Sequence, residues 1–327
     1  MRMTRLAHAL ATGSLTLPPS GTIAVYRPQI GDDLSVLPAD RVIVLTGWKP
    51  DHDHFARDYP VTPTPPHAAA LVCLPRSREG GRALIAQAAA EVTPGGMILV
   101  DGQKTDGIDA ALKDLRSRVD LSESLSKAHG KLAWFAAGPD LSDWAARPRL
   151  IADGIQTLPG IFSADGPDPA SVLLAASLPD KLQGKVADLG AGWGYLARAI
   201  LARPGVKRLD LVEAEADALA ACRMNITDDR AQFHWADATS FRPEALLDAV
   251  VMNPPFHVGR TADPSLGVAF IQAARRMLAP SGALWLVQNR HLPYASALTD
   301  AFLEWTEVAG NGGFRVIHAI KPKRAKP

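Results

Sequence analysis

Cysteine, net charge and long apolar runs are all scarce in this chain of 327 residues. No apolar segment approaches the roughly 20 residues that a membrane-spanning helix requires, so we expect no contact with a membrane. Residues 1–17 include two arginines, but polar side chains interrupt the apolar stretch that follows them. This interruption argues against a secretory signal peptide.

The two cysteines, Cys73 and Cys222, lie far apart in the chain. They cannot build a disulfide framework or a cysteine-based metal site, and their scarcity is typical of a reducing compartment. Residues 51–54 alternate aspartate with histidine, but they lack cysteine partners and the helical His-x-x-x-His spacing of a metal site. We interpret this segment as a solvent-exposed loop and expect a cytoplasmic protein without a metal ion.

Basic and acidic side chains nearly balance, at 35 and 34, and give a formal net charge of +1. Proteins that coat nucleic acid are usually more basic, so this balance neither requires nor excludes an RNA partner. The basic segment at residues 321–326 has two interpretations. It can contact phosphate groups of a nucleic acid, or it is a solvent-exposed end of the chain. Hydrophobic residues make up 47% of the chain, which argues against general disorder.

Strand-like apolar segments alternate with helix-like segments along the whole chain, and the pattern occurs twice. Alternation of this kind predicts an α/β fold with two mostly parallel sheets, each flanked by helices. Four prolines and three glycines between residues 147 and 171 indicate a linker or an ordered loop. We therefore predict one domain at residues 1–148 and a second at residues 149–327.

The predicted elements follow from periodicity and from Gly and Pro punctuation. In the first half we predict strands at 41–45, 69–74 and 97–100, and helices at 81–92 and 108–121. In the second half we predict strands at 185–189, 208–212, 232–235, 248–252 and 283–287, with helices at 172–178, 195–201, 216–225 and 264–278. Residues 305–308 and 314–320 are typical of a closing hairpin.

A glycine-rich turn joins a predicted strand directly to a predicted helix. It consists of Asp188-Leu-Gly190-Ala-Gly192-Trp-Gly194, and such a turn lets the backbone approach a ligand closely. The spacing differs from the G-x-G-x-x-G of dinucleotide sites, because Tyr195 stands three positions after Gly192. The turn therefore favours S-adenosylmethionine over a nicotinamide cofactor, and the alternative is a turn that only shapes the backbone.

Acidic residues follow the next two predicted strands. Glu213 lies about 20 residues beyond the glycines, where a ribose contact is expected. Asp237, followed by Ala238, comes after the third strand and can accept from an adenine amino group. Ligands of open α/β sheets bind at the carboxyl ends of the strands, so these positions support a site for S-adenosylmethionine.

Asn253-Pro254-Pro255-Phe256 directly follows the fourth predicted strand. The lone pair of an aromatic or amide –NH₂ group is delocalised, which makes the nitrogen a poor nucleophile. The side-chain oxygen of Asn253 and the carbonyl of Pro254 can accept its two hydrogens and direct the lone pair at a methyl group. Pro255 stiffens the loop and Phe256 offers a face for a base. The alternative is a Pro-Pro turn after a buried strand.

Several motifs together resemble the bacterial 16S ribosomal RNA guanine-N2 methyltransferases. They are Asn-Pro-Pro-Phe-His at 253–257, Leu-Pro-Gly-Ile-Phe-Ser at 158–163 followed by Asp165-Gly166 and Asp168, Asn289 with Leu-Pro-Tyr at 292–294, and Gly-Phe-Arg-Val at 313–316. Other amino-methylating enzymes share Asn-Pro-Pro-Phe, so the segment at 158–163 narrows the choice. The motifs span nearly all of residues 155–320, and Leu-Pro-Arg-Ser at 74–77 matches the family's first domain.

The resemblance implies two tandem class I methyltransferase domains, of which the first is degenerate and lacks a cofactor site. It implies methylation of N2 of a guanine in ribosomal RNA, with the small subunit or its RNA as partner, and we expect a monomer. Asn253, Pro254, Pro255 and Phe256 would be catalytic, whereas Phe162, His257 and Asn289 would contact the substrate. Alternative functions are methylation of a protein glutamine, methylation of adenine N6, and a non-catalytic RNA-binding or assembly role.

Overall fold

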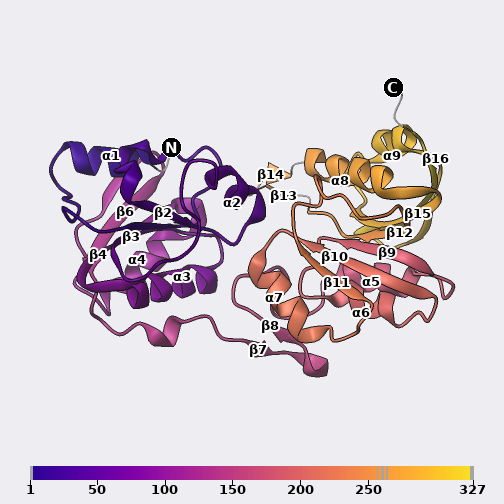
Figure 1. Ribbon diagram of the computed structural model, residues 1–327, viewed down its shortest axis with the longest axis horizontal. Helices are drawn as coiled ribbons and strands as arrows, with labels where there is room; N and C mark the ends of the chain where they lie inside the picture. Colours follow the sequence, from indigo (N-terminus) through magenta and orange to yellow (C-terminus); the bar gives the residue numbers. More distant parts are fainter. Residues whose placement is uncertain (1–2, 256, 259–260, 263, 325–327) are drawn as a thin grey trace. The chain divides into compact units, whose positions relative to one another are not determined.

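The computed structural model describes residues 3–255, 257–258, 261–262 and 264–324 (Figure 1). The chain divides into two compact units, which we call the N-terminal and C-terminal units. The N-terminal unit contains residues 1–149 with 158–160, and the C-terminal unit contains residues 150–157 with 161–327. Each unit has its own sheet and its own hydrophobic cores. In the described part of the chain, no helix is long and apolar enough to cross a membrane.

The N-terminal unit is built on a sheet with the strand order β2-β1-β3-β4-β6-β5. Strands β2, β1, β3 and β4 run parallel, whereas β6 is antiparallel to both of its neighbours. The strands are β1 (Ile23–Tyr26), β2 (Val42–Leu45), β3 (His67–Cys73), β4 (Val92–Gln103), β5 (Leu125–Lys127) and β6 (Gly130–Ala136). The helices are α1 (Met3–Ala11), α2 (Lys49–Phe55), α3 (Arg78–Glu91) and α4 (Ile108–Arg116).

The segment predicted as a solvent-exposed loop at residues 51–54 belongs to helix α2, so that prediction was wrong. Pro50 stands in the first turn of this helix, and Phe55 at its end is buried at 3% exposure in the core beside α1. Proline in the first turn is a helix-start signal, because its missing N–H would have no helical partner there. Among the described residues, no group of three or more His, Cys, Asp or Glu side chains could hold a metal ion.

The C-terminal unit has a sheet with the strand order β11-β10-β9-β12-β15-β17-β16. Strand β17 pairs antiparallel with β15 and β16, and the other neighbouring strands pair in parallel. The strands are β9 (Gly184–Leu189), β10 (Val206–Glu213), β11 (Ala231–Trp235), β12 (Leu247–Met252), β15 (Leu278–Asn289), β16 (Phe302–Gly310) and β17 (Phe314–Pro322). The helices are α5 (Pro169–Ser177), α6 (Tyr195–Leu201), α7 (Ala216–Asn225), α8 (Pro264–Met277) and α9 (Ala295–Ala301). Two short ladders join β7 (Arg149–Leu150) with β8 (Gln156–Thr157) and β13 (His257–Val258) with β14 (Thr261–Ala262).

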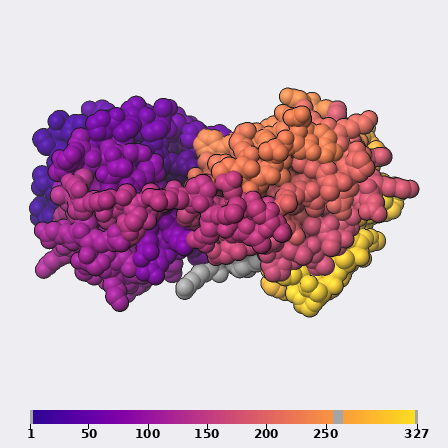
Figure 2. All heavy atoms as spheres, turned by 90° about the horizontal axis from the view of Figure 1, so that it is seen from below, coloured from indigo at the N-terminus to yellow at the C-terminus, as the bar shows by residue number. Residues whose placement is uncertain are grey.

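Alternate side chains of the central strand β9 enter different cores of the C-terminal unit. Ala187 packs in the core that contains residues of α8 and α9, and Val186 packs in the core that contains residues of α5 and α6. Because side chains of a strand point alternately to its two faces, helices cover both faces of this sheet. The predicted hairpin of β16 and β17 is confirmed, and the end of the chain, yellow in Figure 2, lies at one side of this unit.

The two sheets share one topology except for a single edge strand. From β2 to β5, the order in the N-terminal unit matches the order from β10 to β16 in the C-terminal unit, with no counterpart of β11 among the described residues. Strand β1 corresponds to β9, and strand β3 corresponds to β12. The predicted fold class, two tandem methyltransferase-like α/β domains with mostly parallel sheets, is thereby confirmed.

Candidate active site

The glycine-rich turn connects β9 to α6 and has an unusual backbone. Gly190, Gly192 and Gly194 have φ angles of 79°, 55° and 97°, a region that side chains disfavour. A Cβ on Gly192 would meet no heavy atom within 4 Å, so open space lies beside this residue. A Cβ on Gly194 would lie 3.0 Å from Cγ1 of Ile226 and 3.1 Å from Sγ of Cys222. Gly192 therefore leaves room for a ligand, whereas Gly194 allows close packing on α7.

Glu213 ties the end of β10 to this turn. Its Oε2 accepts a hydrogen bond from the N–H of Gly192 at 2.8 Å, and its Oε1 accepts from the N–H of Glu215 at 2.8 Å. Burial is the main cause that raises the pKa of the Glu213 carboxyl. Each carboxylate oxygen has two lone pairs, so both oxygens keep the capacity to accept from a ligand hydroxyl.

Asp237 and Ala238 follow β11, at the same edge of the sheet as Glu213, which pairs with Trp235 of that strand. The Asp237 carboxylate accepts from the N–H of Thr239 at 2.8 Å and from its hydroxyl at 2.7 and 2.8 Å. Ala238 is buried at 5% exposure. The local turn thus holds the Asp237 side chain in place at the carboxyl end of β11.

Asp188 of β9 is a buried carboxyl group with no hydrogen-bond partner in the described part of the chain. It is 0% exposed, and neither of its oxygens accepts a hydrogen bond from the described residues. Burial, and then the nearby Glu213, raise the pKa of Asp188 to about 8. An unpaired buried carboxylate is strongly disfavoured, so a cationic group of a ligand would stabilise the ionised form.

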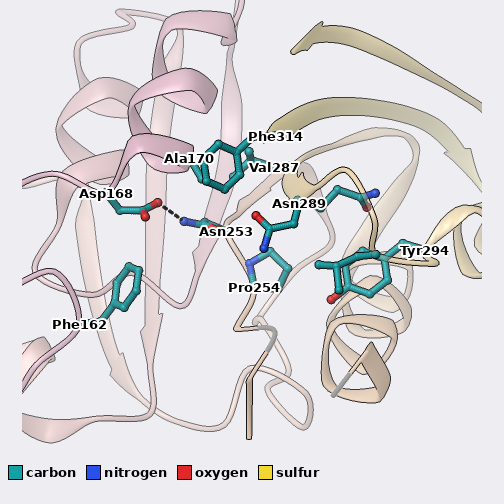
Figure 3. A pocket seen from close by; sticks show the side chains of 11 residues that line it. Phe162, Asp168, Ala170, Asn253, Pro254, Val287, Asn289, Tyr294 and Phe314 are labelled. Atoms are coloured by element: carbon teal, nitrogen blue, oxygen red, sulfur yellow. Dashed lines mark hydrogen bonds between the residues drawn. The ribbon is translucent and has the colours of Figure 1, made fainter. Parts of the chain in front are cut away.

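The side chain of Asn253 is held by two hydrogen bonds at the end of β12. Its Nδ2 donates to Oδ2 of Asp168 at 2.8 Å (Figure 3). The same nitrogen donates to Oγ of Ser171 at 2.9 Å. Both acceptors belong to the start of α5, because Asp168 is its N-cap residue. These bonds use both hydrogens of the amide and leave Oδ1 as the atom that can accept from a ligand.

Two cavities of the C-terminal unit meet at Asn253. The first, of about 50 Å³, lies along the glycine turn and is called the cofactor cavity; its lining includes Gly190, Gly192 and Trp193. The second, of about 180 Å³, is called the substrate cavity (Figure 3). The residues that line both cavities are Phe162, Asp168 and Asn253. A group held in one cavity therefore lies close to a group held in the other.

The substrate cavity is closed by the ends of β12, β15 and β17. Its lining includes Pro254, Asn289, Tyr294 and Phe314, and the register of the sheet pairs Asn289 with Phe314. Tyr294 is fully buried, and a Cβ on Gly267 of α8 would clash with its hydroxyl oxygen. A side chain at position 267 of α8 would therefore displace the Tyr294 ring, which forms one wall of the substrate cavity.

Trp193 of the glycine turn holds the segment that carries Phe162. Its indole N–H donates to the carbonyl of Ser163 at 3.1 Å, and its own carbonyl accepts from Asn225 Nδ2 at 2.9 Å. The same Asn225 amide donates to the carbonyl of Gln156 at 2.8 Å. Phe162 is 65% exposed at the boundary of the two cavities, where its ring is available to a ligand.

The structure brings several predicted site residues together and leaves others apart. Phe162, Asn253, Pro254 and Asn289 line one cavity, and Gly190 and Gly192 line its neighbour. Pro255 is exposed. Phe256 lies outside the described residues, and for His257 only the backbone position in β13 is described.

The sequence analysis noted Asp168 only as part of a family motif, and it assigned a site role neither to Asp168 nor to Ser171. An Asp followed by Pro is a helix-start signal, and Asp168 does cap α5. That local signal carries no information on a contact with Asn253, which lies 85 residues further along the chain.

Known proteins resemble this chain over most of its length. The methyltransferase small domain family matches residues 153–318. Ribosomal RNA small subunit methyltransferase C of Pseudomonas paraeruginosa is 34% identical over 266 residues, which are 78% of this chain and 80% of that protein. The protein of the same name from Pseudomonas aeruginosa (strain UCBPP-PA14) is 32% identical over 314 residues, covering 88% and 93% of the two chains.

A solved structure extends the similarity to nearly the whole chain. It is the 16S rRNA N2 methyltransferase RsmC of T. thermophilus, in complex with AdoMet and guanosine. The TM-score is 0.79 at 25% identity, and the match covers 94% of this chain and 90% of that one. The chain therefore belongs to the ribosomal RNA small subunit methyltransferase C family.

Proposed function

We propose that this protein transfers a methyl group from S-adenosylmethionine to the exocyclic N2 of a guanine in small-subunit ribosomal RNA. The observation that carries the proposal is the position of Asn253, whose amide stands where the cofactor cavity and the substrate cavity meet. The similarity to RsmC, a 16S rRNA N2 methyltransferase solved with AdoMet and guanosine, supports the same substrate class. We also propose that the protein acts in the cytoplasm as a monomer without a metal ion.

The carboxyl ends of β9, β10 and β11 would hold the cofactor. Asp188 would bind its α-ammonium group, Glu213 its ribose hydroxyls, and Asp237 with Ala238 its adenine ring. Gly192 leaves the backbone open on the side where the ligand would lie. When bound, S-adenosylmethionine supplies an electrophilic methyl group on its sulfonium.

The loop after β12 would orient the nucleophile. Oδ1 of Asn253 and the carbonyl of Pro254 would accept the two hydrogens of the guanine amine, which directs its lone pair toward the cofactor cavity. Pro255 would stiffen the loop, and Phe162 and Phe256 would contact the base. Asn289 and His257 would contact its edges. No strong general base is needed, because the nitrogen loses a proton after it has accepted the methyl group.

We propose that the N-terminal domain, residues 1–148, is a degenerate copy without a cofactor site, and that residues 149–327 form the catalytic domain. The turn after β1 begins Arg27-Pro28-Gln29 and lacks the three glycines that follow the corresponding strand β9. Leu74-Pro75-Arg76-Ser77 follows β3, where Asn253 and its neighbours follow the corresponding strand β12. The N-terminal domain would support folding or help to hold RNA.

Methyl transfer from labelled S-adenosylmethionine tests the proposal. The labelled cofactor is offered in parallel to unmethylated small subunits, naked ribosomal RNA and a release-factor protein. We expect label in N2-methylguanine, and the Asn253→Ala variant should lose turnover while it keeps its affinity for the cofactor. Label on a protein glutamine or on adenine N6 would replace the proposal. Cofactor binding without any transfer would favour a non-catalytic role.

A further inference from the structure

Asp168 and Ser171 form a closed set of hydrogen bonds with Asn253. Oδ2 of Asp168 accepts from the N–H of Ser171 at 2.9 Å and from Nδ2 of Asn253 at 2.8 Å. The Ser171 hydroxyl accepts the second hydrogen of Nδ2 at 2.9 Å. Ser171 is only 7% exposed. One carboxylate thus both starts helix α5 and reaches the amide at the end of β12.

The direction of the Asn253 amide matters because its two ends have opposite hydrogen-bonding character. The carbonyl oxygen can accept a hydrogen bond from an amine. The –NH₂ end can only donate, so it cannot form a hydrogen bond with the hydrogens of a guanine amine. A carboxylate only accepts, but a hydroxyl can donate or accept. Asp168 therefore determines which end of the amide is turned toward the base, and Ser171 adapts to either direction.

We propose that Asp168 is a positioning residue for methyl transfer: it fixes the Asn253 amide so that Oδ1 accepts from the guanine amine. The inference rests on the proposed function for the identity of that amine. A hydrogen bond to an ionised acceptor is about twice as strong as a neutral one. It also polarises the amide and increases the negative charge on Oδ1. This charge stabilises the positive charge that develops on the amine nitrogen during transfer.

A serine at position 168 separates this role from helix capping. Serine is also a good N-cap residue, but its side chain is too short to reach Asn253. For Asp168→Ser we expect kcat to fall about 10- to 100-fold, as for the loss of a charge-assisted hydrogen bond. KM for the RNA and the affinity for S-adenosylmethionine should stay nearly unchanged, because the contact acts mainly in the transition state.

Two further variants define the origin of the effect. Ser171→Ala should lower kcat by only about fivefold, the effect of one neutral hydrogen bond. Asp248→Ser is the matched control, because Asp248 stands at the opposite end of β12 and accepts from the N–H of Lys185 at 2.8 Å, far from both cavities. This variant should keep the wild-type kcat.

A second measurement does not depend on turnover. The side-chain amide signals of Asn253 in a nitrogen-15 NMR spectrum, assigned through Asn253→Asp, should shift in Asp168→Ser and stay in place in Asp248→Ser. Shifted signals with a loss of kcat support the inference. Unchanged signals, or unchanged kcat in an active enzyme, overturn it. If the wild-type protein methylates no guanine, the proposed function is refuted, and the guanine amine is no longer the group that Oδ1 of Asn253 binds. Shifted signals would in that case still establish the contact between Asp168 and Asn253.

Discussion

Arg5 and Asp101 form a bidentate ion pair in the interior of the N-terminal unit. Arg5 Nε lies 2.9 Å from Oδ2 of Asp101, and Nη2 lies 2.6 Å from Oδ1. The two residues are 0% and 1% exposed, and Arg5 also donates to the carbonyl of Lys127 at 2.9 Å. The pair joins helix α1 to the end of β4, although the two residues are 96 positions apart.

Removal of one partner of this pair should strongly destabilise the protein. Arg5→Ala removes the counter-charge that Arg5 supplies to the buried Asp101, and we expect a loss of about 3–5 kcal/mol in the free energy of unfolding of the N-terminal unit. Hydrogen exchange of the amides in α1 and β4 measures this loss.

The exposed pair of Arg118 with Asp143, at 2.7 Å, is the control. Arg118→Ala should lower the free energy of unfolding much less than Arg5→Ala, because solvent screens an exposed ion pair. The double replacement Arg5→Met with Asp101→Leu should restore much of the stability, because apolar side chains can replace a buried ion pair. Equal losses in the two single variants would contradict this account.

Binding of S-adenosylmethionine should depend on pH through Asp188. The pKa of this carboxyl is raised to about 8 in the free protein, and the cofactor's ammonium should lower it. Binding at pH 7 should therefore release about one proton, and affinity should rise as the pH approaches 8. Above about 8 the α-amino group of the cofactor itself loses its proton, so affinity should fall again.

Calorimetry in buffers of different ionisation enthalpy counts these protons. 5′-Methylthioadenosine, which lacks the amino acid portion of the cofactor, is the control ligand and should bind without proton release. Asp188→Asn should remove the proton release and the rise in affinity toward pH 8, and it should weaken the binding of the cofactor. A pH-independent affinity of the wild-type protein would show that Asp188 does not bind the ammonium.

The same replacement should stabilise the ligand-free protein. The folded-state pKa of Asp188 lies above the ordinary value of 3.8, so the folded state binds more protons than the unfolded state between these pH values. Its contribution therefore destabilises the fold progressively as the pH rises from about 4 to about 8. Asp188→Asn should raise the Tm at pH 8 and change it little at pH 4. A lower Tm at pH 8 would contradict the assignment.

Trp193 should contribute to substrate binding through Phe162. Trp193→Phe keeps an aromatic ring and removes the hydrogen bond to the Ser163 carbonyl, which costs about 1 kcal/mol. We expect KM for the RNA to rise about fivefold, because Phe162 is held less firmly at the boundary of the cavities.

Trp305→Phe is the matched control for this prediction, since its indole N–H donates to the Thr299 hydroxyl at 3.1 Å in another part of the unit. Steady-state kinetics with small subunits as substrate compares the two variants. An equal effect of both replacements would show that the change is a general loss of stability.

The local sequence pattern was sufficient to predict the central strands of the C-terminal unit. Apolar periodicity predicted strands β9 to β12, and the positive φ angles of Gly190, Gly192 and Gly194 agree with the glycines in the sequence of the turn. In the N-terminal unit, β1, β5, β6, α1 and α2 were not predicted. The first two of these are only four and three residues long, so they carry little periodic signal.

The sequence by itself determined where a strand ends in a glycine turn and where an amide follows a strand, because those signals lie within a few consecutive residues. Only the tertiary structure decided that Asp168 holds Asn253 and that Arg5 neutralises Asp101. It also decided that Asp188 is buried with no hydrogen-bond partner among the residues that the structure describes. The physical reason is the distance along the chain. Residues 85 or 96 positions apart form a hydrogen bond because the order of strands in the sheet brings them together. The sequence pattern within a few residues does not determine that order.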